Sequence, residues 1–164
     1  QRKASETCPE GKVLVMDCRG DSSAASAGNI LVTRLMTRGA AGLVTDGGLR
    51  DTPEIETYDM PTYIGAPSAP TNLIKHHAVP ELNQPIGCGG VPVYPDDVIV
   101  GDREGVLVIP AHLADQIAED AARQERQESF ILGEIQSGKP LRGTYPPNEE
   151  TQARIDAWMK DQGA

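Results

Sequence analysis

The sequence predicts an α/β domain with a long helix and an extended tail at its C-terminal end. An apolar strand pattern at 12–18, a helical pattern at 24–38 and a second apolar strand up to Val44 form a strand–helix–strand unit. This order implies parallel strands. From 85 to 110, short apolar runs alternate with turn residues, and the run from 111 to 136 is rich in Ala, Glu and Gln, as in a long helix.

The composition excludes several classes of protein. Of 164 residues, 38% are hydrophobic and 24% are charged, which is typical of a globular chain. A net charge of -9 and an aromatic content of 4% argue against surfaces that bind nucleic-acid phosphates or stack on bases. Three widely spaced cysteines form no zinc motif and fit a reducing compartment, and no apolar run is long enough to cross a bilayer. We therefore expect a cytoplasmic protein whose partners are neither nucleic acids nor membranes.

The first elements form a candidate anion site. Residues 12–18 are predicted as a buried strand. In the range 24–38, small residues are followed by apolar positions that suit one face of a helix, with Gly28 and Asn29 near its start and Gly39 as its stop. A strand, a glycine-containing loop and a helix N-terminus together hold anions on free backbone N–H groups.

The stretch from 43 to 54 is the strongest candidate for function. Its apolar start predicts a buried strand, which ends in a polar residue and two glycines and then presents Arg50, Asp51 and Glu54 almost together. Paired glycines let the backbone turn sharply or approach a ligand closely. We expect a small acid and a metal ion to meet at this point.

Arg50 and Asp51 match the groups of a 2-oxo acid. The guanidinium of Arg50 is a planar fork suited to a carboxylate. Asp51 is a hard oxygen donor suited to Mg2+ or Mn2+, which would act as a Lewis acid on the keto oxygen. Four residues at the helix start would offer backbone groups to the same anion: Gly28, Asn29, Ile30 and Leu31. The alternatives are a surface Arg–Asp ion pair and simple helix capping.

Other polar residues are weaker candidates. Four carboxylates lie nearby in sequence and are open to roles as metal partners or general bases: Asp17, Asp21, Asp46 and Glu54. For Asp46, capping of the turn before the glycines is favoured. His76 and His77 are adjacent and point in different directions, so an exposed segment is favoured over a metal site. Asp102 is expected to shape a hairpin.

The C-terminal part is predicted as a long helix, an extended proline-containing linker and a short helix at 149–160. The stretch 118–129 is too polar for a core helix, and we expect it to cross solvent or to meet another subunit. We expect a first domain over residues 1–142 and a C-terminal tail over residues 143–164.

Two motifs, in order along the chain, resemble those of the RraA-like family. The first joins GNIL at 28–31 to GGLRDTPE at 47–54, and the second is GGVPVYPDDVIVGDREGVLVIP at 89–110. The resemblance covers residues 12–135. This family contains the class II pyruvate aldolases that act on 4-hydroxy-4-methyl-2-oxoglutarate and 4-carboxy-4-hydroxy-2-oxoadipate, and also the regulator of ribonuclease E activity. We expect the family's N-terminal portion to be missing here, and the tail resembles a subgroup extension.

The resemblance implies a compact swivelling β/β/α fold assembled as homotrimers or hexamers, with sites between subunits. It implies that Asp51 holds Mg2+ or Mn2+, that Arg50 binds the pyruvoyl carboxylate, and that the backbone of residues 28–31 completes the substrate cradle. The implied activity is a metal-dependent lyase reaction, the retro-aldol cleavage of a 4-hydroxy-2-oxo acid to pyruvate. The same enolate chemistry implies oxaloacetate decarboxylation as a side activity.

One position departs from the family pattern. Aldolases carry an Asp for proton transfer where this chain has Asn29, which is neither charged nor a base. The alternative is therefore a non-catalytic protein of the regulator type that binds an RNA-processing enzyme, and a sugar-acid enzyme is a third possibility. Glu54 matches the acidic position of the family, and Glu125 or Glu128 is a candidate carboxylate from a neighbouring subunit. Asp96 stands where the family has a turn glycine, so this turn must tolerate a side chain.

Overall fold

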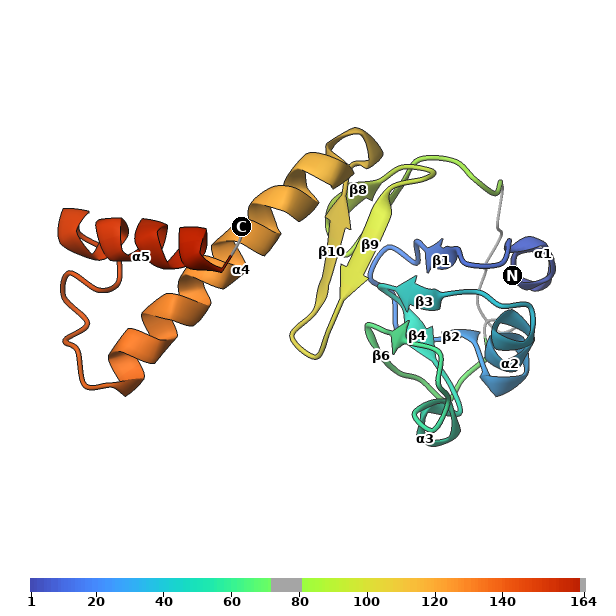
Figure 1. The fold of residues 1–164 in the computed structure, drawn as a ribbon. Coiled ribbons are helices and arrows are strands. Elements are labelled where there is room, and N and C mark those ends of the chain that lie inside the picture. Colours follow the sequence, from blue (N-terminus) through green and yellow to red (C-terminus); the bar gives the residue numbers. More distant parts are fainter. Residues whose placement is uncertain (72–80, 163–164) are drawn as a thin grey trace. The chain divides into compact units, whose positions relative to one another are not determined.

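The computed structural model describes residues 1–71 and 81–162, so His76 and His77 lie outside the described residues. The chain forms two compact units, Gln1–Ala111 and His112–Ala164; the domain boundary expected at residue 142 stays a prediction. In chain order the first unit contains α1 (Arg2–Thr7), β1 (Val13–Met16), β2 (Ala25–Ala27), α2 (Asn29–Thr37), β3 (Gly42–Thr45), β4 (Gly48–Leu49), α3 (Thr52–Ile55), β5 (Thr62–Tyr63), β6 (Ala66–Pro67), β7 (Ile86–Cys88), β8 (Val91–Val93), β9 (Val98–Gly101) and β10 (Val106–Ile109) (Figure 1).

Two parallel three-stranded sheets form the centre of this unit, with strand orders β1-β3-β5 and β2-β4-β6. In the first sheet Val13 pairs with Gly42 and Leu43 pairs with Thr62. In the second, Gly48 lies between Ala25 and Ala66. Three chain segments each supply one strand to the first sheet and the next strand to the second, which is why the two orders match. The predicted α/β class with parallel strands is confirmed.

The junction between the two sheets is tightly packed around Asp46. A Cβ atom on Gly65 would lie 2.4 Å from the backbone oxygen of Asp46, so only glycine fits there. The Asp46 carboxylate accepts the backbone N–H of Cys18 at 2.7 Å and that of Gly20 at 2.9 Å. It also lies 3.4 Å from the N–H of Gly89. Asp46 therefore fastens the loop after β1 and the turn between β7 and β8 to this junction.

The helix predicted within residues 24–38 is α2, so its start near Gly28 and Asn29 is confirmed, but the strand formed by the small residues before it was not predicted. Ala25–Ala27 form strand β2, all three residues are buried, and α2 begins only at Asn29. Three small residues carry no apolar periodicity that separates a strand from a helix start. Pairing with β4 decides the outcome, because it satisfies the buried backbone groups of this segment.

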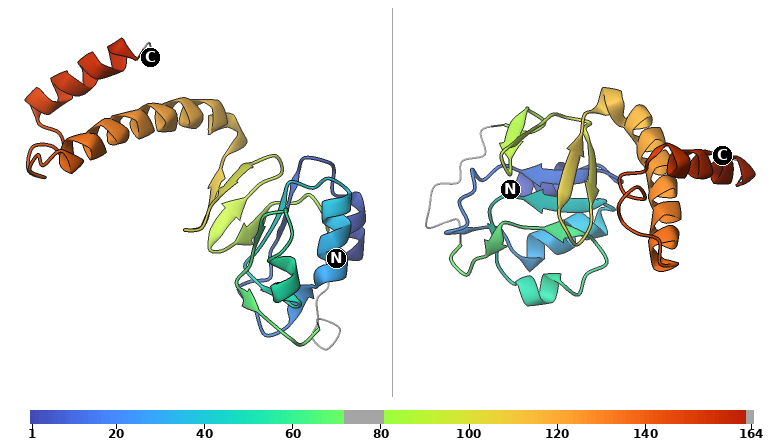
Figure 2. Two further views of the ribbon diagram at one scale, coloured as in Figure 1. Left: turned by 60° about the horizontal axis from the view of Figure 1, so that its bottom comes forward. Right: turned by 90° about the vertical axis from the view of Figure 1, so that its left-hand side faces the viewer.

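The core of the first unit lies between α2 and the two sheets. Val32 and Leu35 project from one face of α2 and are buried together with Leu43, Leu49 and Ile55. Helix α1 lies beside α2, as Figure 2 also shows. The guanidinium of Arg34 on α2 binds the carboxylate of Glu6 on α1 at 2.8 Å. This ion pair holds the pKa of the Glu6 carboxyl below its usual value, because the hydrogen bond from Arg34 favours the charged form.

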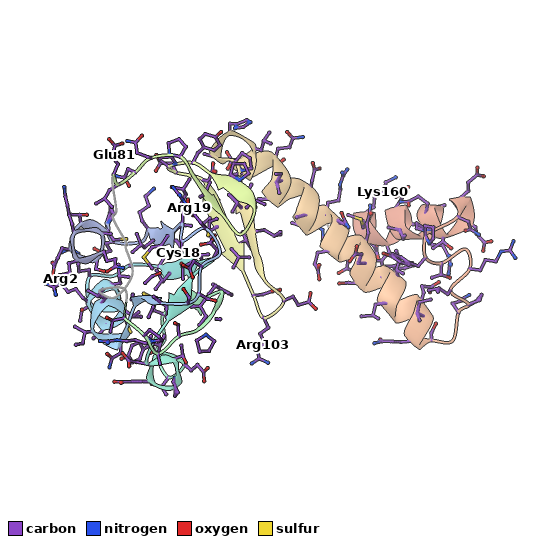
Figure 3. All side chains as sticks on the ribbon, turned by 180° about the vertical axis from the view of Figure 1, so that it is seen from behind. Arg2, Cys18, Arg19, Glu81, Arg103 and Lys160 are labelled. Carbon is purple, nitrogen blue, oxygen red and sulfur yellow. The ribbon has the colours of Figure 1, made fainter. Side chains whose placement is uncertain are left out.

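Two antiparallel hairpins, β7–β8 and β9–β10, complete the first unit. Asp102 shapes the second hairpin as expected, because its carboxylate accepts the backbone N–H groups of Glu104 at 2.7 Å and Gly105 at 3.2 Å. Arg103 marks the tip of this hairpin in Figure 3. Asp96 adopts the left-handed conformation with a φ of 71°, so the turn before β9 does accommodate a side chain.

The second unit is a helical hairpin. A short 3-10 turn, Ala111–Leu113, leads into α4 (Ala114–Gln136), and α5 (Glu149–Asp161) turns back along α4 (Figure 2). The ring centroids of Phe130 on α4 and Trp158 on α5 lie 5.6 Å apart, and Ile131 and Ile155 of the same two helices are buried. The side chain of Asn148 caps α5 by accepting the backbone N–H of Thr151 at 2.9 Å. None of the described helices combines the length and apolar character of a membrane span.

Candidate active site

The carboxyl edge of the β2-β4-β6 sheet brings the two predicted motifs together. Strand β2 leads into Gly28 and the N-terminus of α2, and the neighbouring strand β4 leads into Arg50 and Asp51. The backbone N–H of Arg50 donates to the backbone oxygen of Ala27 at 3.1 Å, which extends the strand pairing up to the site. Ligands of open parallel sheets bind at this edge, where the loops after neighbouring strands meet.

Asp51 occupies the centre of the candidate site. It caps α3 in the left-handed conformation, with φ 60° and ψ 29°, and this backbone turn directs its side chain toward α2. Its Oδ2 atom lies 3.2 Å from the backbone N–H of Asn29 and 3.4 Å from Nε of Arg50. The Asp51 and Arg50 side chains are 37% and 41% exposed, so both remain accessible to a small ligand.

Gly28 is required by the close approach of the two motifs. A Cβ atom at this position would lie 2.6 Å from Oδ2 of Asp51 and 2.8 Å from Nε of Arg50. Its φ of -137° is available to any residue, so the constraint is space and not backbone conformation. The missing side chain lets the Arg50–Asp51 pair lie directly against the start of α2.

Gly28→Ala should therefore damage the site without straining the backbone. We expect the catalytic efficiency of the activity proposed below to fall by roughly 10- to 100-fold, since displacements near 1 Å have effects of that size. Gly133→Ala, on α4, is the control, because a Cβ there meets nothing within 4 Å. Steady-state kinetics on both variants test this, and an unchanged Gly28→Ala efficiency would contradict the packing argument.

Glu54 joins the site through a chain of side-chain hydrogen bonds. The Asn29 amide donates from Nδ2 to Oε2 of Glu54 at 2.6 Å, and the Tyr58 hydroxyl donates to Oε1 at 3.4 Å. The Thr33 hydroxyl donates in turn to the Tyr58 oxygen at 3.1 Å. Both carboxylate oxygens of Glu54 are therefore engaged, and α2 and α3 are connected at two successive helical turns.

The other two predicted cradle residues take different positions. The backbone N–H groups of Leu31 and Val32 donate to the backbone oxygen of Gly28, both at 3.1 Å, so Leu31 contributes to the first turn of α2 itself. The side chain of Ile30 is 75% exposed. The structure thus brings Gly28, Asn29, Arg50 and Asp51 into contact, while Ile30 and Leu31 flank them.

Asp51 fits a divalent metal ion that takes most of its ligands from water and substrate. Its Oδ1 atom has no hydrogen-bond partner among the described residues, whereas Oδ2 is held by the neighbouring N–H groups. Over residues 1–71 and 81–162, no cluster of three or more His, Cys, Asp or Glu side chains is placed to hold a metal ion. Mg2+ commonly uses one or two protein carboxylates and keeps several waters, so this donor set suits it.

Glu54 was a candidate from the sequence, whereas Thr33 and Tyr58 were not predicted. A signal was present, because Thr33 lies four residues after Asn29 and Tyr58 lies four residues after Glu54. Residues at this spacing share one face of a helix. It was not decisive, because nothing in the sequence indicates that these two faces meet.

The cysteines near the sheet junction give no sign of a nucleophile. The Cys18 thiol lies 2.7 Å from the Ser26 hydroxyl, and Cys88 is buried. Burial raises the pKa of the Cys88 thiol to about 11, and the nearby Asp46 carboxylate acts in the same direction. A thiol that remains protonated at neutral pH is a poor nucleophile, so a structural role is the simplest account of Cys88.

The comparisons with known proteins agree with the motifs. A model of the RraA-like family, described as aldolase/RraA, matches residues 1–108. The chain belongs to the RraA-like family. A protein of Halalkalibacterium halodurans with the provisional name 4-hydroxy-4-methyl-2-oxoglutarate aldolase is 33% identical to this RraA-like chain over 126 residues. The match covers 77% of this chain and 59% of that relative, so the chain spans about three fifths of the relative's length.

Two solved structures resemble this RraA-like chain. A Pseudomonas syringae protein of unknown function gives a TM-score of 0.79 at 24% identity, with 85% of this chain and 70% of that one covered, which supports the fold alone. Streptomyces coelicolor RraAS2 is described as an unusual member of the RNase ES inhibitor RraA family. It gives a TM-score of 0.67 at 28% identity over 78% of this chain and 65% of its own. The predicted fold class is thereby confirmed.

Proposed function

We propose that this chain is a divalent-metal-dependent lyase that cleaves a 4-hydroxy-2-oxo acid to pyruvate, and that it also decarboxylates oxaloacetate. The observation that carries the proposal is the meeting of Arg50, Asp51 and the N-terminus of α2 at one sheet edge. The family membership and the name of the Halalkalibacterium halodurans relative support the same reaction class. We propose Mg2+ or Mn2+ as the cofactor and a small 2-oxo acid as the substrate.

Each residue of the site has a distinct role in this proposal. Arg50 binds the substrate carboxylate through its terminal guanidinium nitrogens, while its Nε stays beside Asp51. The N-terminus of α2, beginning at Asn29, favours negative charge because its first N–H groups lack intrahelical acceptors. Asp51 would hold the metal ion, which when bound polarises the keto oxygen as a Lewis acid.

A direct assay of pyruvate release tests the proposal. The protein is incubated with Mg2+ and either oxaloacetate or a 4-hydroxy-2-oxo acid, and pyruvate is measured through lactate dehydrogenase. We expect Mg2+-dependent release that EDTA abolishes and that added Mg2+ restores. Rates equal to those without enzyme on every substrate would contradict the lyase function. A heat-denatured sample controls for the spontaneous decarboxylation of oxaloacetate.

We also propose that the chain assembles as a homotrimer or hexamer, with its sites completed between subunits. Several apolar side chains of the β9–β10 hairpin are exposed, including Leu107 at 68%, and an interface would cover them. Glu125 and Glu128 are exposed on α4 and are available to a neighbouring site. Light scattering coupled to size-exclusion chromatography measures the assembly, and a monomer at micromolar concentration would contradict it.

A regulator-type function is the second candidate. Asn29 favours it, because the amide donates to Glu54 and cannot act as the base that aldolases carry at this position. The likeness to RraAS2 of Streptomyces coelicolor points in the same direction. If pyruvate release is absent, a pull-down with a purified ribonuclease E-type enzyme becomes the deciding measurement. Retention of that enzyme would support the regulator function, and its absence would exclude it.

A further inference from the structure

Four side chains form a hydrogen-bond network between α2 and α3. Asn29 and Thr33 lie one turn apart on α2, and Glu54 and Tyr58 lie at the same spacing on and just after α3. The bonds run from Asn29 to Glu54, from Tyr58 to Glu54 and from Thr33 to Tyr58. Asn29 and Tyr58 both donate to the Glu54 carboxylate, which is therefore the terminal acceptor of the network.

This hydrogen-bond network and the candidate active site share Asn29. Its side chain binds Glu54 at 2.6 Å, while its backbone N–H lies 3.2 Å from Oδ2 of Asp51. Any displacement of Asn29 would therefore move a hydrogen-bond partner of Asp51. Asp51 also precedes α3 directly, and its backbone oxygen accepts the N–H groups of Glu54 and Ile55, both at 3.1 Å. The two helices that bound the site are thus connected both at the site and one turn away from it.

Asn29 and Glu54 are chemically matched. An amide offers two N–H donors, whereas an ionised carboxylate only accepts. An Asp at position 29 would bring two carboxylates to a separation where the structure has a 2.6 Å hydrogen bond, and like charges so close repel strongly. In this chain the Asn29 amide is therefore a suitable donor to the Glu54 carboxylate.

We propose that Glu54 is a positioning residue that holds the Asn29 end of α2 against Arg50 and Asp51, with Tyr58 and Thr33 fixing the Glu54 carboxylate. This inference rests on the lyase function proposed above and assigns to that site a supporting set of residues. Glu54 acts through Asn29 and does not itself contact the substrate.

The experiment compares variants of Glu54 with a control at Glu56, an exposed carboxylate two residues away on the same segment. Glu54→Leu removes the acceptor, whereas Glu54→Gln keeps an oxygen that can accept the Asn29 amide. Asn29→Ala and the double variant Asn29→Ala/Glu54→Leu complete a double-mutant cycle. Binding of pyruvate in the presence of Mg2+ is measured by calorimetry, kcat and KM are measured with oxaloacetate, and the thermal midpoint of each unliganded variant reports the fold.

We expect Glu54→Leu to weaken pyruvate binding by roughly 10-fold or more, since positioning errors near 1 Å have effects of this order. Glu54→Gln should remain within roughly threefold of the wild-type protein and Glu56→Leu should equal it. The double variant should bind no worse than Glu54→Leu alone, because both changes break the same contact.

Three results would overturn the positioning role without contradicting the lyase function. Wild-type affinity in Glu54→Leu would remove the positioning role, and additive losses in the double variant would show that Glu54 and Asn29 act separately. If the loss of pyruvate affinity in Glu54→Leu only follows a lowered thermal midpoint, and Glu54→Gln is equally impaired, then Glu54 contributes only to the stability of the fold. A wild-type protein that binds no pyruvate would instead reject the proposed lyase function, and the positioning role with it.

Discussion

Asp51→Asn should lower pyruvate release by at least roughly 100-fold while leaving the fold intact. The amide has the size of the carboxylate, and Asn tolerates the left-handed conformation that Asp51 adopts, with its φ of 60°. It can still accept the Asn29 N–H, now 3.2 Å from Oδ2, so the local packing is preserved. What it loses is the negative charge that would hold Mg2+ beside the substrate, and this loss affects the transition state directly.

Asp51→Asn is a sharper test than Asp51→Ala, because alanine in the left-handed region would add roughly 1–2 kcal/mol of backbone strain. Asp59→Asn, an exposed carboxylate that follows α3, is the matched control and should retain wild-type kinetics. The thermal midpoint of Asp51→Asn should shift by less than about 4 °C. Activity within threefold of the wild-type protein would exclude Asp51 as the metal-binding residue.

Gly65→Ala should produce the largest loss of stability in the first unit. A Cβ atom there would lie 2.4 Å from the backbone oxygen of Asp46, 2.9 Å from its carbonyl carbon and 3.1 Å from the backbone oxygen of Gly47. All three atoms belong to the backbone at the junction between the two parallel sheets, so no side chain can rotate to make room. We expect a loss of about 3 kcal/mol in the free energy of unfolding, at the upper end for overpacking.

A loss of that size corresponds to a fall in the thermal midpoint of about 6–12 °C for a chain of this length. Gly87→Ala is the control, because Gly87 also lies in a strand but a Cβ there meets nothing within 4 Å. Thermal unfolding followed by circular dichroism compares the two variants. Equal midpoints would mean that the junction is more tolerant than its packing implies.

Local pattern alone determined much of the fold. The strand–helix–strand order predicted parallel pairing, which the β1–β3 register confirms. The turn at 102–105 and the polar character of the long helix were also predicted from the sequence, because both depend on interactions within a few residues. Strand β2 was not predicted from the sequence, since Ala25–Ala27 form a strand only through their pairing with β4. The two-residue strands β4 and β6 have the same origin, because they exist only as parts of a bent chain path that crosses from one sheet to the other.

The candidate site likewise combines features that were predicted from the sequence with features that only the tertiary structure sets. The sequence by itself predicted Arg50 and Asp51 as a carboxylate-binding and metal-binding pair and the start of α2 as their partner, because residue type and order indicate that chemistry. Only the tertiary structure decided that Gly28 must lack a side chain and that Asn29 is matched to Glu54. Both depend on distances of about 3 Å between atoms more than twenty residues apart in the chain. Such distances are set by strand pairing at the sheet edge, which no local pattern encodes.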